Sequence, residues 1–169
     1  MHPSEFAAPE RREFRPDVTV ATVVERDGRF LFVEERVRGA LVLNQPAGHL
    51  ERGETVLEAA VRETLEESAW EVELTGLVAV YHWVEPEQRR PLIRFTFAAR
   101  LLRERVGASL DTGIVRALWL SEDEARSDAF VPRSPFVLRS VEDYRARKLL
   151  PLDALPALDL GAGATIVSQ

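Results

Sequence analysis

Apolar and polar positions along the chain predict strands first. Residues 18–24 (VTVATVV) form a β-branched, almost continuously apolar run, which is typical of a buried strand. Asp27-Gly28 is a tight-turn signal, and residues 29–35 follow as the second arm of a hairpin. A second turn and a shorter apolar run at 41–43 come next. The first quarter of the chain therefore predicts a small antiparallel unit.

The remaining pattern predicts a helix, more strands and a second helical region. A polar loop leads into a helix over about residues 55–68, and Thr55 can cap its start. The order strands, helix, strands, helix favours an α/β fold, a mixed α/β/α sandwich. The later predicted elements are strands at 77–84 and 93–102 joined by the polar stretch 85–90, a strand at 115–120, a helix start at Ser121 and a helix over 134–149.

The length of 169 residues fits one domain, and no internal repeat is visible. Residues 1–16 contain three prolines and several charges, so we expect a loose N-terminal tail. Residues 17–150 carry the patterned elements and form the predicted domain. Residues 151–169 are rich in leucine, alanine, proline and glycine without a clear period, and we expect a C-terminal extension of the same domain.

Composition removes several classes of function. The chain has no cysteine, which excludes disulfides, zinc–thiolate sites and thiol nucleophiles. The net charge of −6 argues against non-specific binding of nucleic acid, which needs a basic surface. The N-terminus has no apolar core of a secretory signal, and no apolar run approaches the roughly 18 residues of a membrane span. We therefore expect a cytoplasmic protein that acts on a small molecule.

The predicted helix at 55–68 places three acids together. With Glu63 as the reference, Glu66 and Glu67 are its i+3 and i+4 neighbours, so the three carboxylates share one face. A solvated acidic face is the common explanation for such a cluster. However, like charges at this spacing repel, and a divalent cation such as Mg²⁺ would remove the repulsion. The adjoining arc is predicted to face the core and holds Leu57, Ala60, Val61, Thr64, Leu65 and Ser68.

The residues around this helix resemble a known motif, the Nudix box. The box has glycine, five residues, glutamate, seven residues, Arg-Glu, an aliphatic residue, any residue, Glu-Glu, any residue, glycine and an aliphatic residue. Two positions depart from it, because Thr64 replaces an aliphatic residue and Ala69 replaces a glycine that plausibly takes a positive φ at the end of the helix. The matching positions are Gly48, Glu54, Arg62, Glu63, Glu66 and Glu67.

The resemblance implies a Nudix-type sandwich with a catalytic loop–helix–loop and a hydrolase of phosphoanhydride bonds. It implies that Mg²⁺, with Mn²⁺ as a substitute, is bound by the Gly48 carbonyl, Glu66 and Glu67. Glu63 is implied to be a further ligand, or the group that orients or deprotonates the attacking water. The catalytic set implied in this way is Glu63, Arg62 and Glu67. Arg62 is expected to pair with Glu54 or Glu63 and hold the carboxylates in place.

Outside the box, residues 44–51 (NQPAGHLE) and several shorter segments resemble the phosphatase NudJ subgroup. That resemblance implies release of orthophosphate from nucleoside tri- and diphosphates and from hydroxymethylpyrimidine diphosphate, a thiamine precursor. Two alternatives stay open. One is a Nudix pyrophosphohydrolase that releases pyrophosphate or cleaves ADP-ribose or dinucleotides, and the other is a non-catalytic Nudix module that binds nucleotide for regulation. A monomer is favoured, with a dimer left open.

Further candidates for substrate contacts lie on strands and loops, and each has a plainer interpretation. Trp83 could stack on a base, although core packing is the usual role of such a residue. Arg94 alternates with its phenylalanine neighbours and could clamp a phosphate if its side faces the cleft. Glu34 and Glu35 could add a metal ligand, although a surface acid pair is the simpler interpretation. The complete set of candidates for substrate binding is His49, His82, Trp83, Arg94 and Arg133.

Overall fold

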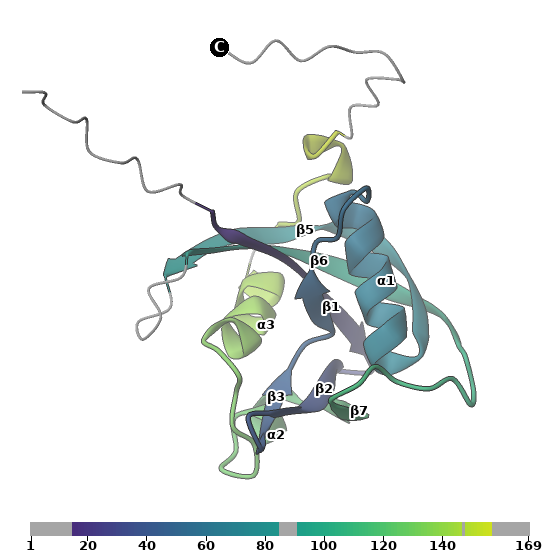
Figure 1. Ribbon diagram of the computed structural model, residues 1–169, viewed down its shortest axis with the longest axis vertical. Coiled ribbons are helices and arrows are strands. Elements are labelled where there is room, and N and C mark those ends of the chain that lie inside the picture. The colour runs from purple at the N-terminus through teal and green to yellow at the C-terminus, as the bar shows by residue number, and fades with distance from the viewer. Residues whose placement is uncertain (1–14, 85–90, 147, 157–169) are drawn as a thin grey trace, which may run out of the picture.

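The computed structural model describes residues 15–84, 91–146 and 148–156. The fold alternates strands and helices in the predicted order (Figure 1). Within these residues the strands are β1 (Asp17–Arg26), β2 (Arg29–Val37), β3 (Ala40–Asn44), β4 (Ala47–His49), β5 (Trp70–Val84), β6 (Pro91–Glu104) and β7 (Ile114–Leu120). The helices are α1 (Val56–Ser68), α2 (Glu122–Ala125) and α3 (Phe136–Ala146), followed by a 3₁₀ turn, η1 (Leu152–Ala154).

Strand β1 pairs with three other strands of the sheet, β2, β4 and β6. It runs parallel to β6 from Asp17 to Val24, and it pairs antiparallel with β4 along Thr19 to Ala21 on its other edge. At its end it turns into the predicted hairpin with β2. The full order is β3-β2-β1-β6-β5, with β4 paired to β1 and β7 paired to β2. Parallel and antiparallel pairs occur together, so the predicted mixed sheet is confirmed.

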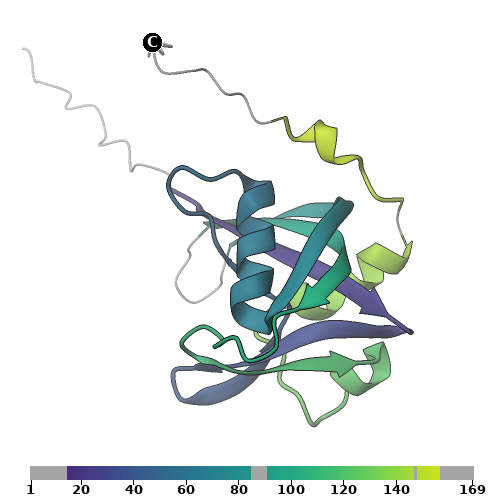
Figure 2. The same cartoon turned by 90° about the vertical axis from the view of Figure 1, so that its right-hand side faces the viewer.

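Helices cover the sheet on two sides, as the predicted sandwich requires (Figures 1 and 2). On one side, α2 and α3 pack over β1, β2 and β3 through a cluster that includes Val23, Phe30 and Val137. On the other side, α1 packs over β1, β5 and β6 through Ala59, Ala60 and other residues. Both clusters depend on β1, and burial of their apolar side chains is the main driving force for the fold.

Helix α1 begins and ends as its sequence predicts. Thr55 Oγ1 accepts a hydrogen bond from the Glu58 amide at 3.2 Å, and Glu58 Oε2 accepts one from the Thr55 amide at 2.8 Å. This reciprocal capping box satisfies two backbone donors that the helix itself cannot pair. At the other end Ala69 takes the left-handed conformation, with φ 61° and ψ 15°, and its amide donates to the Leu65 carbonyl at 2.8 Å.

The buried face of α1 differs from the predicted apolar arc. Glu63 and Glu67 are both only 8% exposed, whereas Val61, predicted to face the core, is 36% exposed. The small side chains on the buried face let α1 approach the sheet closely. Thr64, which stands at an aliphatic position of the box, forms a buried hydrogen bond of 2.8 Å between its hydroxyl and that of Thr22 on β1. The acidic face and the core face therefore overlap.

Other differences concern the ends of elements. Residues 47–49, predicted as a loop, form β4, because their backbone pairs with β1. Strand β5 begins at Trp70, seven residues before its predicted start at 77, and α3 is shorter than predicted. Residues 1–14 of the predicted tail at 1–16, the stretch 85–90 and the end of the C-terminal extension at 157–169 lie outside the described residues. Among the helices that the structure describes, none is long and apolar enough to cross a membrane.

The left-handed conformation of Ala69 leads to a prediction about stability. Glycine adopts this conformation without steric strain, whereas a Cβ atom makes it costly. We expect Ala69→Gly to raise the free energy of unfolding by up to about 1 kcal/mol. Catalysis should stay within a few-fold, because Ala69 carries no side-chain group that could bind metal or substrate. Urea denaturation and steady-state kinetics measure the two effects, and an unchanged or lower stability would contradict the prediction.

Candidate active site

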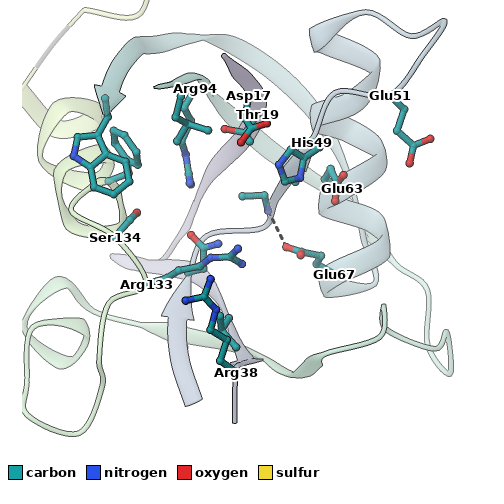
Figure 3. A pocket seen from close by; sticks show the side chains of 17 residues that line it. Asp17, Thr19, Arg38, His49, Glu51, Glu63, Glu67, Arg94, Arg133 and Ser134 are labelled. Carbon is teal, nitrogen blue, oxygen red and sulfur yellow. Dashed lines mark hydrogen bonds between the residues drawn. The ribbon is translucent and has the colours of Figure 1, made fainter. Parts of the chain in front are cut away.

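Strand β4 places the start of the Nudix-like segment in close contact with α1. An added Cβ atom at Gly48 would lie 2.2 Å from the carboxyl carbon of Glu63, so only glycine leaves room for this carboxylate. One residue earlier, the Ala47 amide donates to Glu67 Oε2 at 2.8 Å, as the dashed line in Figure 3 shows. Pairing of β4 with β1 thus holds the backbone at the position where it meets both glutamates.

Arg62 connects the acids of α1 to the loop before the helix. Its guanidinium donates to both oxygens of Glu54, from Nε at 2.9 Å and from Nη2 at 2.6 Å. Its Nη1 donates to Glu63 Oε1 at 2.8 Å and to Glu66 Oε2 at 2.9 Å. These bonds raise the pKa of Arg62, with the Glu54 bond as the largest cause. A planar, permanently charged guanidinium can orient several carboxylates at once, which a lysine could not do as well.

Burial controls the protonation of the two cavity glutamates. Desolvation raises the pKa of Glu67 to about 8, against the Ala47 hydrogen bond, which lowers it, and the nearby charges of Glu35 and Glu63 raise it further. Desolvation also raises the pKa of Glu63, although Arg62 opposes this effect. Both carboxylates are thus unstable as anions where they stand, and a cation beside them would stabilise the charged form.

These two glutamates line one wall of a cavity of about 690 Å³. Figure 3 shows Glu63 and Glu67 on the α1 side, Arg94 on the sheet side, and Arg133 and Arg38 below them. The end of the cavity away from α1 is aromatic. There Trp83 and Phe136 meet edge to face, with their ring centroids 5.6 Å apart. The cavity therefore combines an acidic wall, a cluster of arginines and an aromatic end.

Arg94 differs from the other arginines that line the cavity because it is almost completely buried. Its side chain is only 5% exposed, and its Nη2 donates to Gln45 Oε1 at 3.0 Å. Its guanidinium also lies 5.5 Å from the ring centroid of Phe136. Burial and the nearby charge of Arg133 lower its pKa to about 10. In the described part of the chain, its Nε has no hydrogen-bond partner and no carboxylate pairs with it, so an anion in the cavity would compensate its charge.

Successive side chains of β5 point to opposite faces of the sheet, so the aromatic candidate Trp83 and the candidate His82 lie on different sides. Tyr81 packs on Phe136 with ring centroids 5.2 Å apart, and its hydroxyl donates to Asp143 Oδ2 at 2.9 Å, which indicates a structural role. Trp83 lies on the same side of the strand and reaches the cavity. His82 points to the other side, is exposed, and borders a separate shallow hollow. The structure thus brings Trp83 to the cavity and leaves His82 out.

The remaining predicted site residues also form two groups, those that line the cavity and those that do not. Glu66 is partly exposed, pairs with Arg62 and does not line the cavity. In the stretches that the structure describes, no three acidic or histidine side chains lie close enough to form a metal site as they stand. Arg62 Nη1 binds the carboxylates of both Glu63 and Glu66. The predicted residues that do line the cavity are Gly48, His49, Glu63, Glu67, Trp83, Arg94 and Arg133.

Sequence reasoning missed several cavity residues. The sequence pattern places Phe136 in the final predicted helix and Arg38 in a predicted turn, but it does not indicate that both line the cavity. Glu35 was interpreted as half of a surface acid pair, but it is only 7% exposed and hydrogen-bonded to Asn44 at 3.0 Å. The one available signal in the sequence was that Glu35 continues the alternate positions of Leu31 and Val33 along the strand.

Comparison with known proteins shows the family to which the chain belongs. Residues 13–140 match the model of the NUDIX domain. The chain belongs to the Nudix family. It is 37% identical over 142 residues to phosphatase NudJ from Escherichia coli (strain K12), which covers 84% of this chain and 92% of that protein. Family membership and this relative identify the protein as a hydrolase of phosphoanhydride bonds.

Solved structures support the same assignment. A Nudix hydrolase from Nitrosomonas europaea superposes with a TM-score of 0.84 and 44% identity, covering 87% of this chain and all of that one. A MutT Nudix hydrolase from Burkholderia pseudomallei superposes with a TM-score of 0.64 and 20% identity, covering 76% and 98% of the two chains. The second structure shares the fold alone.

The contact between Gly48 and Glu63 makes a prediction about activity. In Gly48→Ala, the new methyl group would overlap the carboxylate, which is the end of a flexible side chain and can swing aside. We therefore expect the variant to fold with nearly unchanged thermal stability and to lose activity by about 100-fold or more, because a small misplacement of a catalytic group is costly. Thermal melting and kinetics test this. Activity near that of the wild type would show that the position of Glu63 is not critical.

The raised pKa of Glu67 makes a prediction about stability without metal. The pKa is about 8 in the folded protein against 4.5 as the reference value, so the folded state holds a proton that the unfolded state has lost. The contribution of this proton to the free energy of unfolding is fully present below about pH 4.5, and it is lost as the pH rises through 8. It amounts to a few kcal/mol at most.

In buffer with a chelator, we expect the melting temperature of the wild type to fall by several degrees between pH 6 and pH 9 relative to that of Glu67→Gln. The glutamine variant cannot ionise and serves as the reference for all other titrating groups. Parallel pH profiles for the two proteins would show that Glu67 has an ordinary pKa.

Proposed function

We propose that this hydrolase is a Mg²⁺-dependent phosphatase that releases orthophosphate from nucleoside tri- and diphosphates and from hydroxymethylpyrimidine diphosphate. One observation supports the proposal most. A single cavity places two buried carboxylates opposite the guanidinium groups of Arg94 and Arg133, with the rings of Trp83 and Phe136 at one end. The similarity to phosphatase NudJ supports release of orthophosphate in particular.

The residues present fit a divalent cation. Glu63 and Glu67 are hard oxygen donors, both are buried beside the cavity, and burial destabilises their charged forms. The space that Gly48 leaves open brings its backbone next to Glu63. We therefore propose Gly48, Glu63, Glu66 and Glu67 as the residues that hold the metal. When bound, Mg²⁺ neutralises charge on the phosphate and lowers the pKa of water.

Each side chain around the metal site has a distinct proposed task. Glu63, whose pKa is raised by burial, can accept the proton of the attacking water at its carboxylate. Arg62, fixed by Glu54, orients Glu63 and Glu66 through its Nη1. Arg62 would have to release part of its contact with Glu66 when that carboxylate turns toward the metal. Positioning of this kind is a large part of catalysis in phosphoryl transfer.

The opposite wall holds the substrate in this proposal. Arg94 and Arg133 bind the phosphate oxygens, for which guanidinium groups are well suited. Trp83 and Phe136 pack against the planar ring of the substrate, as aromatic side chains commonly do. His49 is exposed at the rim beside Gly48 and can contact a distal phosphate. His82 has no role in this proposal, because it borders a different hollow.

The remaining alternative is a pyrophosphohydrolase that attacks between the first and second phosphates. The fold does not distinguish the two reactions, since Nudix enzymes with either activity share it. The reaction products distinguish them directly. A phosphatase yields orthophosphate and a substrate shortened by one phosphate, whereas the alternative yields pyrophosphate from a triphosphate or two monophosphates from a dinucleotide.

The decisive experiment uses the purified full chain with Mg²⁺. A panel of nucleoside di- and triphosphates, ADP-ribose and hydroxymethylpyrimidine diphosphate is scored for orthophosphate and for pyrophosphate. We expect orthophosphate from the diphosphates and triphosphates, and no turnover when a chelator replaces the metal. Pyrophosphate as the main product from triphosphates, or turnover of ADP-ribose alone, would refute the phosphatase proposal.

The control for this panel is a matched pair of substitutions. Glu67→Gln removes one charge from the cavity and should lower kcat by at least about 1,000-fold, a loss typical of a group that acts directly in the transition state. Glu73→Gln removes one charge from β5, where Glu73 forms an exposed pair with Arg100 of β6, and it should leave kcat unchanged. Equal activities of the two variants would remove Glu67 from the catalytic machinery.

A further inference from the structure

Glu35, near the end of β2, is a buried carboxylate without a role in the proposed reaction. Successive side chains of a strand point to opposite faces, so Glu35 shares a face with Leu31 and Val33. Its neighbour Glu34 points the other way and pairs with Arg116 at 2.8 Å. The two adjacent acids of the strand therefore lie in different environments, and only Glu35 faces the interior beside the cavity.

Both oxygens of Glu35 are held by named partners. Oε1 accepts a hydrogen bond at 3.0 Å from Nδ2 of Asn44, which is itself buried in the neighbouring strand β3. Oε2 accepts a hydrogen bond from Nη1 of Arg133. The backbone of Arg133 is fixed as well, because its amide donates to the Leu43 carbonyl at 2.9 Å. The backbone and the end of the Arg133 side chain are thus both tied to the β2–β3 hairpin.

The charge of Arg133 acts on two other charged side chains of the cavity, Glu67 and Arg94. Its positive charge lowers the pKa of Glu67 on one side and that of Arg94 on the other. Figure 3 shows Arg133 below Arg94 and to the left of Glu67, in the same cavity. Glu35 uses only Nη1, and within the described residues no partner occupies Nη2 or Nε. These donors are available for a ligand that enters the cavity.

We propose that Glu35 is a positioning residue that holds Arg133 in the one rotamer from which Nη2 and Nε bind the substrate phosphate. Without Glu35 the long, partly exposed side chain of Arg133 would sample many rotamers, and ordering it on binding would weaken affinity. The inference rests on the proposed function, because it assigns to that site a phosphate-binding arginine with a fixed direction. It predicts that the effect of Glu35 on substrate affinity depends on the presence of Arg133.

A double-mutant cycle tests this dependence. Glu35→Gln keeps the shape and the bond from Asn44 but offers Arg133 no charge, so we expect KM for a nucleoside diphosphate to rise about tenfold with kcat within threefold. Arg133→Gln should raise KM by at least as much. Glu35→Gln in the Arg133→Gln background should cause no further rise, because contributions of residues in one network are not additive.

Two results would overturn the inference. One is an unchanged KM in Glu35→Gln, and the other is the same rise in KM in both backgrounds, which would indicate a general structural role. Glu34→Gln is the matched control, since it removes the adjacent charge from the outer face and should leave KM within twofold. Melting curves verify that each variant is folded. If Glu35→Gln does not fold, the cycle is carried out with Glu35→Asp, which keeps the charge but shortens its reach.

A binding measurement separates this inference from the proposed reaction. Inorganic phosphate is titrated calorimetrically into each protein in metal-free buffer, where no turnover occurs. We expect the Kd of the wild type to rise about tenfold in Glu35→Gln and in Arg133→Gln, with no further rise in the double variant. Absence of phosphate binding by the wild type would overturn the inference. Glu35-dependent phosphate binding by a protein that hydrolyses no substrate would instead refute the proposed function alone.

Discussion

The burial of two carboxylates between a helix and a strand is the constraint on which the rest of the structure depends. Glu63 and Glu67 belong to the face of α1 that packs on the sheet, where burial deprives their charge of most of its solvation. A helix that only needed to fold would place apolar side chains there. The chain instead surrounds the acids with a backbone amide from β4, the guanidinium of Arg62 and the open space at Gly48. Stability is thus given up locally to keep two oxygen donors beside a cavity.

Several features of the fold follow from this constraint. The buried face of α1 uses Ala59, Ala60 and Thr64, whose small volume lets the helix approach β1 until the carboxylates meet β4. Strand β4 has three residues, yet its pairing with β1 fixes the Ala47 amide and the Gly48 backbone at the acids. Helix termination at Ala69 carries a backbone strain that glycine would avoid, but it does so away from the cavity.

Local signals in the sequence predicted the elements well, and long-range contacts limited the rest. The capping box at Thr55, the left-handed end of α1 and the β1–β2 hairpin depend on neighbouring residues, so the sequence pattern was sufficient for them. The buried face of α1 could not be predicted from hydrophobicity, because the structure buries Glu63 and exposes Val61. Glu35 was misjudged for the same reason, since its partner Arg133 lies 98 positions away in the sequence.

The distribution of charge explains why the cavity suits a metal–phosphate substrate. Its acidic wall comes from α1, whereas its arginines come from β6 and from the loop before α3, and each wall is electrostatically unfavourable by itself. Among the described residues, neither glutamate of the acidic wall pairs with these arginines, and Arg133 pairs instead with Glu35 of β2. A cation on one side and a phosphate on the other would satisfy both, with opposite charges in contact inside the cavity. Neither ligand alone balances the site, so binding of the two should be mutually reinforcing.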